Sequence, residues 1–188
     1  MDLRKDNKFT ARGLRNNNPF NLQKTSIQWQ GKTTGNDSRF ETFLTVQQGI
    51  RAGVIDIVGD IAKDGLNTLS KLFESFAPRH ENDTTAYINF VSKAANVAPG
   101  ALLTTNGKID PATLAKIVTA IIQKENGIQQ ANLLPASVIQ EGIQMAINSP
   151  AIKRYILPAP TKTNPAAGKL LDASLIFIFI FLLIYLIK

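Results

Sequence analysis

The chain has 188 residues, 44% of them hydrophobic, a length that suits one compact domain and a short additional segment. It contains no cysteine, which excludes disulfides, thiolate metal sites and a thiol nucleophile, and its single histidine is His80. The formal net charge of +7 favours anionic partners such as nucleic acid, anionic lipid or an acidic cell-wall polymer.

The N-terminal part of the chain predicts loops and one small hairpin. Residues 1–7 are polar and charged, so they do not resemble a secretory signal peptide. The segment 12–35 is rich in Asn, Gly, Gln and Thr, a composition typical of loops and turns. Short strands of a hairpin fit around residues 20–22 and 27–29.

Helical patterns begin after this loop region. Residues 45–63 carry apolar side chains four positions apart, which places one apolar face on a helix that Gly65 ends. A second helix starts near Asn67 and must end near Ala77, because Pro78 follows it.

Capping residues predict three further helices. Asp83 or Thr84 is the candidate N-cap for the third, and Asp110, followed by proline, for the fourth. Gly127 ends the fourth helix, and a last helix runs from Pro135 to a point before Pro150. The predicted fold class is therefore mainly α, with a small N-terminal hairpin.

The C-terminal sequence predicts a membrane anchor. From Ala173 to Ile187 every residue except Ser174 is apolar, which favours a transmembrane helix over residues 170–188. Prolines and lysines make residues 151–169 a linker, so the soluble domain is predicted to span residues 1–150. A buried core helix or an aggregation-prone strand is the alternative for the apolar run.

One carboxylate stands out as a candidate for acid–base chemistry. Glu125 lies at the end of an apolar helix, beside the glycine turn at Gly127. An acid is unfavourable at a helix C-terminus because of the macrodipole, so its placement hints at function. The alternative is an ordinary surface glutamate.

A second candidate site combines amides and an aromatic ring on loops. Arg15, Asn16, Asn17, Asn18 and Trp29 could hold a sugar through hydrogen bonds and ring stacking. The alternative is that these asparagines stabilise turns by bonding their own backbone. A third cluster, residues 77–84 around His80, is explained more economically by helix capping at Asn82 or Asp83.

These motifs resemble a group of phage virion-associated proteins that begin with an Arg-Gly-Leu-Arg-Asn-Asn-Asn-Pro element and are related to lysozyme-like lytic domains. The matching segments are residues 12–19, 39–43, 49–52, 76–78, 81–84, Tyr87 and 125–127. The helix end at residues 120–127 is also similar to that of lytic transglycosylases. Because Glu125 follows the Asn-rich loop, the resemblance implies a rearranged or permuted lysozyme-like domain, in which Phe20 stands where the relatives usually have glycine.

The resemblance implies cleavage of peptidoglycan glycan strands as a phage enters or leaves its host. Glu125 would be the catalytic acid of a lytic transglycosylase or muramidase-like enzyme, with Glu41, Glu81 and Asp83 in reserve. The substrate would be held by Arg15, Asn16, Asn17, Asn18, Trp29 and Tyr87. No cofactor or metal is implied.

The implied location is the virion membrane, or alternatively the host inner membrane. The implied partners are peptidoglycan, the lipid bilayer, capsid proteins and, without specificity, nucleic acid. Two rival functions stay open: a non-enzymatic structural membrane protein that links capsid and membrane in a lipid-containing virion, and a cellular tail-anchored protein. Lysis of cell walls by the purified domain would separate the enzyme from both.

Overall fold

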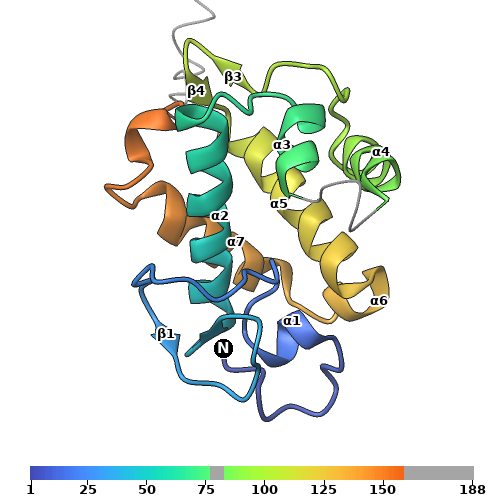
Figure 1. Cartoon of the computed structure of the whole chain (residues 1–188), viewed down its shortest axis with the longest axis vertical. Coiled ribbons are helices and arrows are strands. Elements are labelled where there is room, and N and C mark those ends of the chain that lie inside the picture. Colours follow the sequence, from blue (N-terminus) through green and yellow to red (C-terminus); the bar gives the residue numbers. More distant parts are fainter. Residues whose placement is uncertain (77–82, 159–188) are drawn as a thin grey trace, which may run out of the picture. The chain divides into compact units, whose positions relative to one another are not determined.

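The computed structural model describes residues 1–76 and 83–158, and its first compact unit is Met1–Leu157 (Figure 1). Its helices are α1 (Arg12–Arg15), α2 (Val46–Lys63), α3 (Leu69–Phe76), α4 (Thr84–Ala95), α5 (Pro111–Asn126), α6 (Ile128–Ala131), α7 (Ala136–Ile147) and the 3-10 helix η1 (Lys153–Tyr155). The mainly helical character is as predicted. The short elements α1, α6 and η1 were not predicted.

Side-chain caps determine where the main helices begin. The side chain of Thr45 accepts a hydrogen bond from the Gln48 amide at the start of α2. Asp83 does the same at α4, and Asp110 at α5, where Pro111 occupies the first turn. These contacts satisfy amide groups that have no partner within the helix, which confirms the predicted starts of α4 and α5.

Two helix pairs form the body of the domain: α2 packs against α7, and α4 packs against α5 (Figure 1). The apolar face of α2 is buried in the core, as its periodicity predicts. α7 approaches α2 closely because it has a glycine at the contact. A Cβ atom on Gly142 would lie 2.6 Å from the Cβ of Ile50.

Two small antiparallel hairpins complete the fold. β1 (Lys32–Thr33) pairs with β2 (Thr42–Phe43), whereas the expected strands were at residues 20–22 and 27–29. The expected strand positions are wrong. Phe20 is buried in the core and is not part of a strand. β3 (Thr104–Thr105) pairs with β4 (Lys108–Ile109). They are joined by Asn106 and Gly107, both with positive φ, as in a two-residue hairpin turn.

The predicted fold class needs one correction, which concerns the transmembrane helix. Within residues 1–76 and 83–158, no helix is long and apolar enough to cross a membrane. α2 has 18 residues but carries Arg51, Asp56, Asp60 and Lys63, which makes it too polar to span a bilayer. The predicted anchor at 170–188, and most of the linker before it, lie outside the described residues. For residues 1–76 and 83–158, the fold class is therefore a mainly helical domain with two hairpins.

The compact unit continues beyond Pro150 to Leu157. Ile152 is 1% exposed, and Ile156 forms a parallel bridge with Ile109 of β4. The Leu157 amide donates a hydrogen bond of 2.9 Å to the carbonyl of Ile109. Residues 151–157 thus belong to the folded unit.

Candidate functional site

The candidate site is built around Glu125, in the last turn of α5. Its carboxylate accepts two hydrogen bonds from neutral donors. The hydroxyl of Tyr87 donates to Oε1 over 2.8 Å, and the side-chain amide of Asn21 donates to Oε2 over 2.9 Å. These two hydrogen bonds fix the direction of the carboxylate. Glu125 is half-buried, so it keeps contact with solvent.

Tyr87 reaches Glu125 because α4 packs along α5. Its side chain is only 5% exposed, and its ring centroid lies 4.6 Å from that of Phe73 in α3. The Nζ atom of Lys124 lies 5.6 Å from the centre of the same ring. Burial, together with the negative charge of Glu125, raises the pKa of Tyr87, so its hydroxyl stays protonated and remains a donor.

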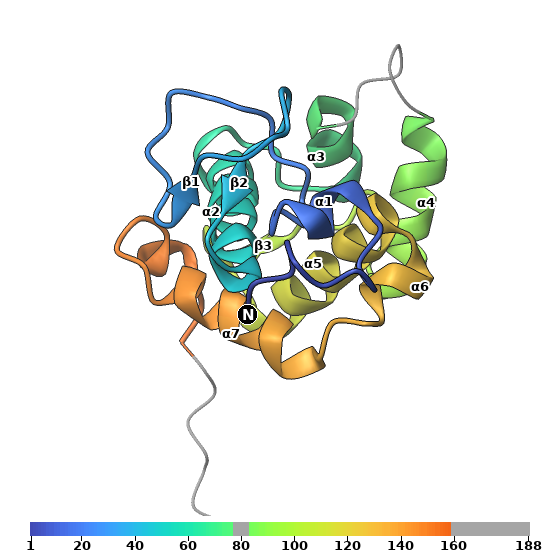
Figure 2. The ribbon, with the colours of Figure 1, turned by 90° about the horizontal axis from the view of Figure 1, so that it is seen from below.

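Asparagines tie the end of α5 to the N-terminal loop. The side-chain amide of Asn126 donates to the carbonyl of Pro19 over 2.8 Å and to that of Ile122 over 2.9 Å. α1 lies beside α5 (Figure 2). A Cβ atom on Gly13 of α1 would come within 2.5 Å of the Asn126 Oδ1 and 2.7 Å of the Asn21 Oδ1. α1 can therefore sit on the end of α5 only because residue 13 has no side chain.

Asn21 and Asn126 belong to the candidate site, but the sequence does not predict them as site residues. Asn21 follows the run of three asparagines and has a positive φ of 51°, which turns the chain back toward α5. In the sequence it is one polar residue among many in a loop. Nothing in its local spacing distinguishes it from its neighbours.

Two of the predicted sugar-binding asparagines have structural partners. The Asn17 side-chain amide donates to the carbonyl of Phe43, and its oxygen accepts from the amide of Leu3. The Asn18 amide donates to the carbonyls of Leu22 and Glu41, each over 3.0 Å. Both side chains are fully buried, so any contribution to substrate binding would be indirect, through the shape of the loop.

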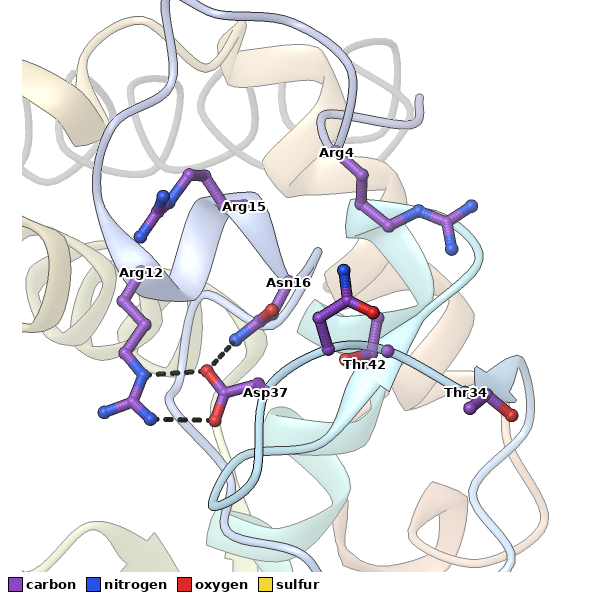
Figure 3. Close-up of a pocket in the computed structure, with 9 residues that line it drawn as sticks. Arg4, Arg12, Arg15, Asn16, Thr34, Asp37 and Thr42 are labelled. Carbon is purple, nitrogen blue, oxygen red and sulfur yellow. Dashed lines mark hydrogen bonds and ion pairs between the residues drawn. The ribbon is translucent and has the colours of Figure 1, made fainter.

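The other predicted substrate-binding residues do not form one cluster. Tyr87 contacts Glu125, whereas Arg15 and Asn16 line a pocket beside α1 (Figure 3). Trp29 lies partly buried in the loop before β1. Substrate contact by these residues stays a prediction.

The reserve carboxylates have other roles. Glu41 is 1% exposed, and its Oε1 accepts from Lys32 Nζ over 2.8 Å and from the Thr25 amide over 2.9 Å. Asp83 caps α4, and Glu81 lies outside the described residues, as does His80. Within the described ranges no group of His, Asp and Glu side chains could hold a metal ion. The geometry therefore offers Glu125 as a solvent-accessible carboxylate held by neutral donors.

No protein-family model matches the chain. It is similar to protein P5 of Pseudoalteromonas phage PM2, with 38% identity over 121 residues, which cover 62% of this chain and 72% of that protein. The chain belongs to the P5 family. The prediction of a bacteriophage protein is thereby confirmed. The name P5 states no activity, so the lysozyme-like relationship and glycan cleavage stay predictions.

Proposed function

We propose that this member of the P5 family is a component of the phage particle that cleaves peptidoglycan glycan strands, with Glu125 as its acid. The observation that carries the proposal is the setting of the Glu125 carboxylate. It is half-buried at a helix end and held by the Tyr87 hydroxyl and the Asn21 amide. The phage relative supports a role in the particle.

The proposed reaction needs one carboxyl group. Glu125 gives its proton to the glycosidic oxygen as the bond from that oxygen to the anomeric carbon breaks. The substrate's own 6-hydroxyl then attacks the anomeric carbon, and Glu125 takes up the hydroxyl proton. The products are a shortened strand and a 1,6-anhydro sugar, with no second carboxylate and no attacking water.

The hydrogen-bond partners of Glu125 suit the donation and uptake of a proton better than the partners of Glu41 do. Glu41 is 1% exposed and is paired with the cation of Lys32, so its carboxylate is not available to a substrate. Glu125 has no ion pair among the described residues, and its two donors are neutral. They orient the carboxylate without adding a permanent charge, so the group can exchange a proton with a substrate.

The test is cleavage of purified peptidoglycan by the full chain and by its Glu125→Gln variant. A mild detergent keeps the chain in solution, because residues 173–187 are strongly apolar. Glu141→Gln is the matched control, since Glu141 is exposed on α7. We expect anhydro-muramyl products from the wild type and from the control, and a rate lower by ~10²–10⁴-fold from Glu125→Gln.

Two outcomes would refute the enzyme proposal: equal rates for wild type and Glu125→Gln, or no product from a chain shown by circular dichroism to be folded. The second outcome would favour the other candidate function, a non-enzymatic structural component of the particle. The observation behind that candidate is that Asn17 and Asn18 are fully used in holding the fold. It predicts that particles carrying Glu125→Gln assemble and infect normally.

A further inference from the structure

A pocket of about 450 Å³ lies beside α1 (Figure 3), and neither Glu125 nor its two donors line it. Its wall combines arginine side chains with amide and hydroxyl groups. The residues that matter are Arg4, Arg12, Arg15, Asn16, Asp37 and Thr42. They come from the N-terminal segment, from α1, from the loop between the strands of the first hairpin, and from β2.

Two of the three arginines are neutralised by carboxylates. Arg12 forms two hydrogen bonds with Asp37, of 2.7 and 2.8 Å, and Arg4 pairs with Asp2 over 2.7 Å. Within the described part of the chain, the guanidinium of Arg15 has no ion pair and no hydrogen bond. Arg15 is therefore the cation in this wall that remains for an anionic ligand.

One wall of the pocket is ordered by hydrogen bonds to Asp37. Asp37 accepts hydrogen bonds from the Asn16 side chain and from the Phe40 amide as well as from Arg12. The Arg12 guanidinium lies 4.4 Å from the centre of the Phe40 ring and holds the pKa of Asp37 well below its usual range. A wall that is ordered before a ligand arrives loses little entropy on binding.

The pocket wall also contains a buried hydroxyl, that of Thr42. Thr42 is 3% exposed, and its Oγ1 has no hydrogen-bond partner among the described residues. A buried polar atom normally has a partner, so an unpaired one in a pocket wall points to a ligand. Together with the Arg15 guanidinium, it marks this pocket as polar and cationic.

We propose that this pocket binds a carboxylate group of an acidic peptide, with Arg15 as the pairing cation. The planar guanidinium matches a carboxylate through two parallel hydrogen bonds, and the neighbouring amide and hydroxyl groups match a peptide backbone. If the proposed function holds, the ligand is the peptide stem of peptidoglycan, which carries free carboxylates next to the glycan strand. The identity of the ligand rests on that function.

The charge balance argues against nucleic acid as the ligand. A polyanion is bound by an unbroken basic surface that neutralises several phosphates at once. Here Asp37 and Asp2 cancel the charges of Arg12 and Arg4. A single unpaired cation in a bounded hollow fits one carboxylate.

The test measures binding of a soluble disaccharide–tetrapeptide by calorimetry, using the full chain with Glu125→Gln so that the ligand is not consumed. In that background Arg15→Gln should weaken binding by ~10-fold or more, because one charged hydrogen-bonding pair is lost. Arg154→Gln is the matched control, since Arg154 is exposed and lies outside the pocket wall. Arg15→Lys, which keeps the charge but not the planar fork, should bind with intermediate affinity.

The inference is overturned if the fragment does not bind, if Arg15→Gln binds as well as the control, or if the peptide-free disaccharide binds equally well. Tighter, Arg15-dependent binding of a short DNA oligonucleotide would also overturn it. This binding assay is independent of cleavage. An inactive enzyme that binds the fragment through Arg15 would refute the proposed function alone, whereas an active enzyme without Arg15-dependent binding would refute this inference alone.

Discussion

At the scale of single residues, the carboxylates of this domain behave differently because their neighbours differ. Glu41 forms an ion pair with Lys32, and Asp37 forms one with Arg12. Glu125 is oriented by neutral donors. Asp56, on α2, has neither kind of partner in the described part of the chain: burial raises its pKa to about 6, and the charge of Asp60 adds to the shift.

The raised pKa of Asp56 predicts a pH-dependent loss of stability. The folded state binds this proton more tightly than the unfolded state, in which the pKa has its ordinary value of 3.8. The contribution to the free energy of unfolding therefore falls as pH rises from about 4 through about 6, and it is level above that range. Asp56→Asn should be more stable than the wild type by ~1–3 kcal/mol at pH 7 and by almost nothing at pH 4.

The measurement is urea unfolding of wild type and Asp56→Asn at several pH values between 4 and 7. The difference between the two chains isolates Asp56 from the other titrating groups. Glu141→Gln serves as a control that should show no such trend, because Glu141 is exposed. A difference that stays constant with pH would show that Asp56 titrates normally.

At the scale of the elements, glycines on α2 determine how the Asn-rich loop meets the helix. A Cβ atom on Gly49 would collide with the carbonyl oxygen of Asn17, and one on Gly53 with the ring of Phe20. Gly59, on the same helix, has nothing nearby. The bulky Phe20, at a position where the resembling proteins usually have glycine, is thus accommodated by the missing side chain of Gly53.

This arrangement predicts opposite effects for two identical substitutions in α2. Gly53→Ala should destabilise the domain by ~1–3 kcal/mol, because the added methyl group displaces a fully buried ring. Gly59→Ala should stabilise it by ~0.5–1 kcal/mol, since alanine favours a helix and the space is open. Thermal unfolding of both variants checks this, and stabilisation by Gly53→Ala would contradict the packing described.

At the scale of the whole molecule, the folded unit is closed by the segment that follows α7. Ile152 is buried in the core, while Ile156 and Leu157 join the backbone of Ile109. This segment packs against β4. A domain that ended at residue 150, as predicted from the sequence, would lack these contacts with β4. Contacts between residues 109 and 156 are distant in the sequence and form only when the helices are packed.

Truncation should reveal this closure. A chain that ends at Pro150 loses the buried Ile152 and the pairing with Ile109, and it should be less stable than a chain that ends at Leu157 by ~2–5 kcal/mol. Ile152→Ala in the longer chain should reproduce much of that loss. Urea unfolding measures all three, and equal stability of the two truncated chains would show that residues 151–157 add nothing to the fold.

The sequence predicts the parts of this protein that depend on nearby residues. The apolar spacing of α2 and the capping side chains at Asp83 and Asp110 define helices because a turn of helix joins residues three or four positions apart. The Asn106-Gly107 pair is also a local signal, typical of a two-residue hairpin turn, although the second hairpin was not among the predicted elements. The first hairpin was misplaced because the burial of Phe20 depends on a helix that comes later in the chain.

The placement of Glu125 at the end of an apolar helix could be deduced from the sequence alone, and so could the likeness to phage proteins. Its partners could not, because Tyr87 and Asn21 lie 38 and 104 positions away. The same holds for the pocket beside α1, where Asp37 meets Arg12 across 25 positions. Local patterns determine which helices form, whereas the packing of α1, α4 and α5 decides which side chains meet, because distant residues come together only when their elements share one core.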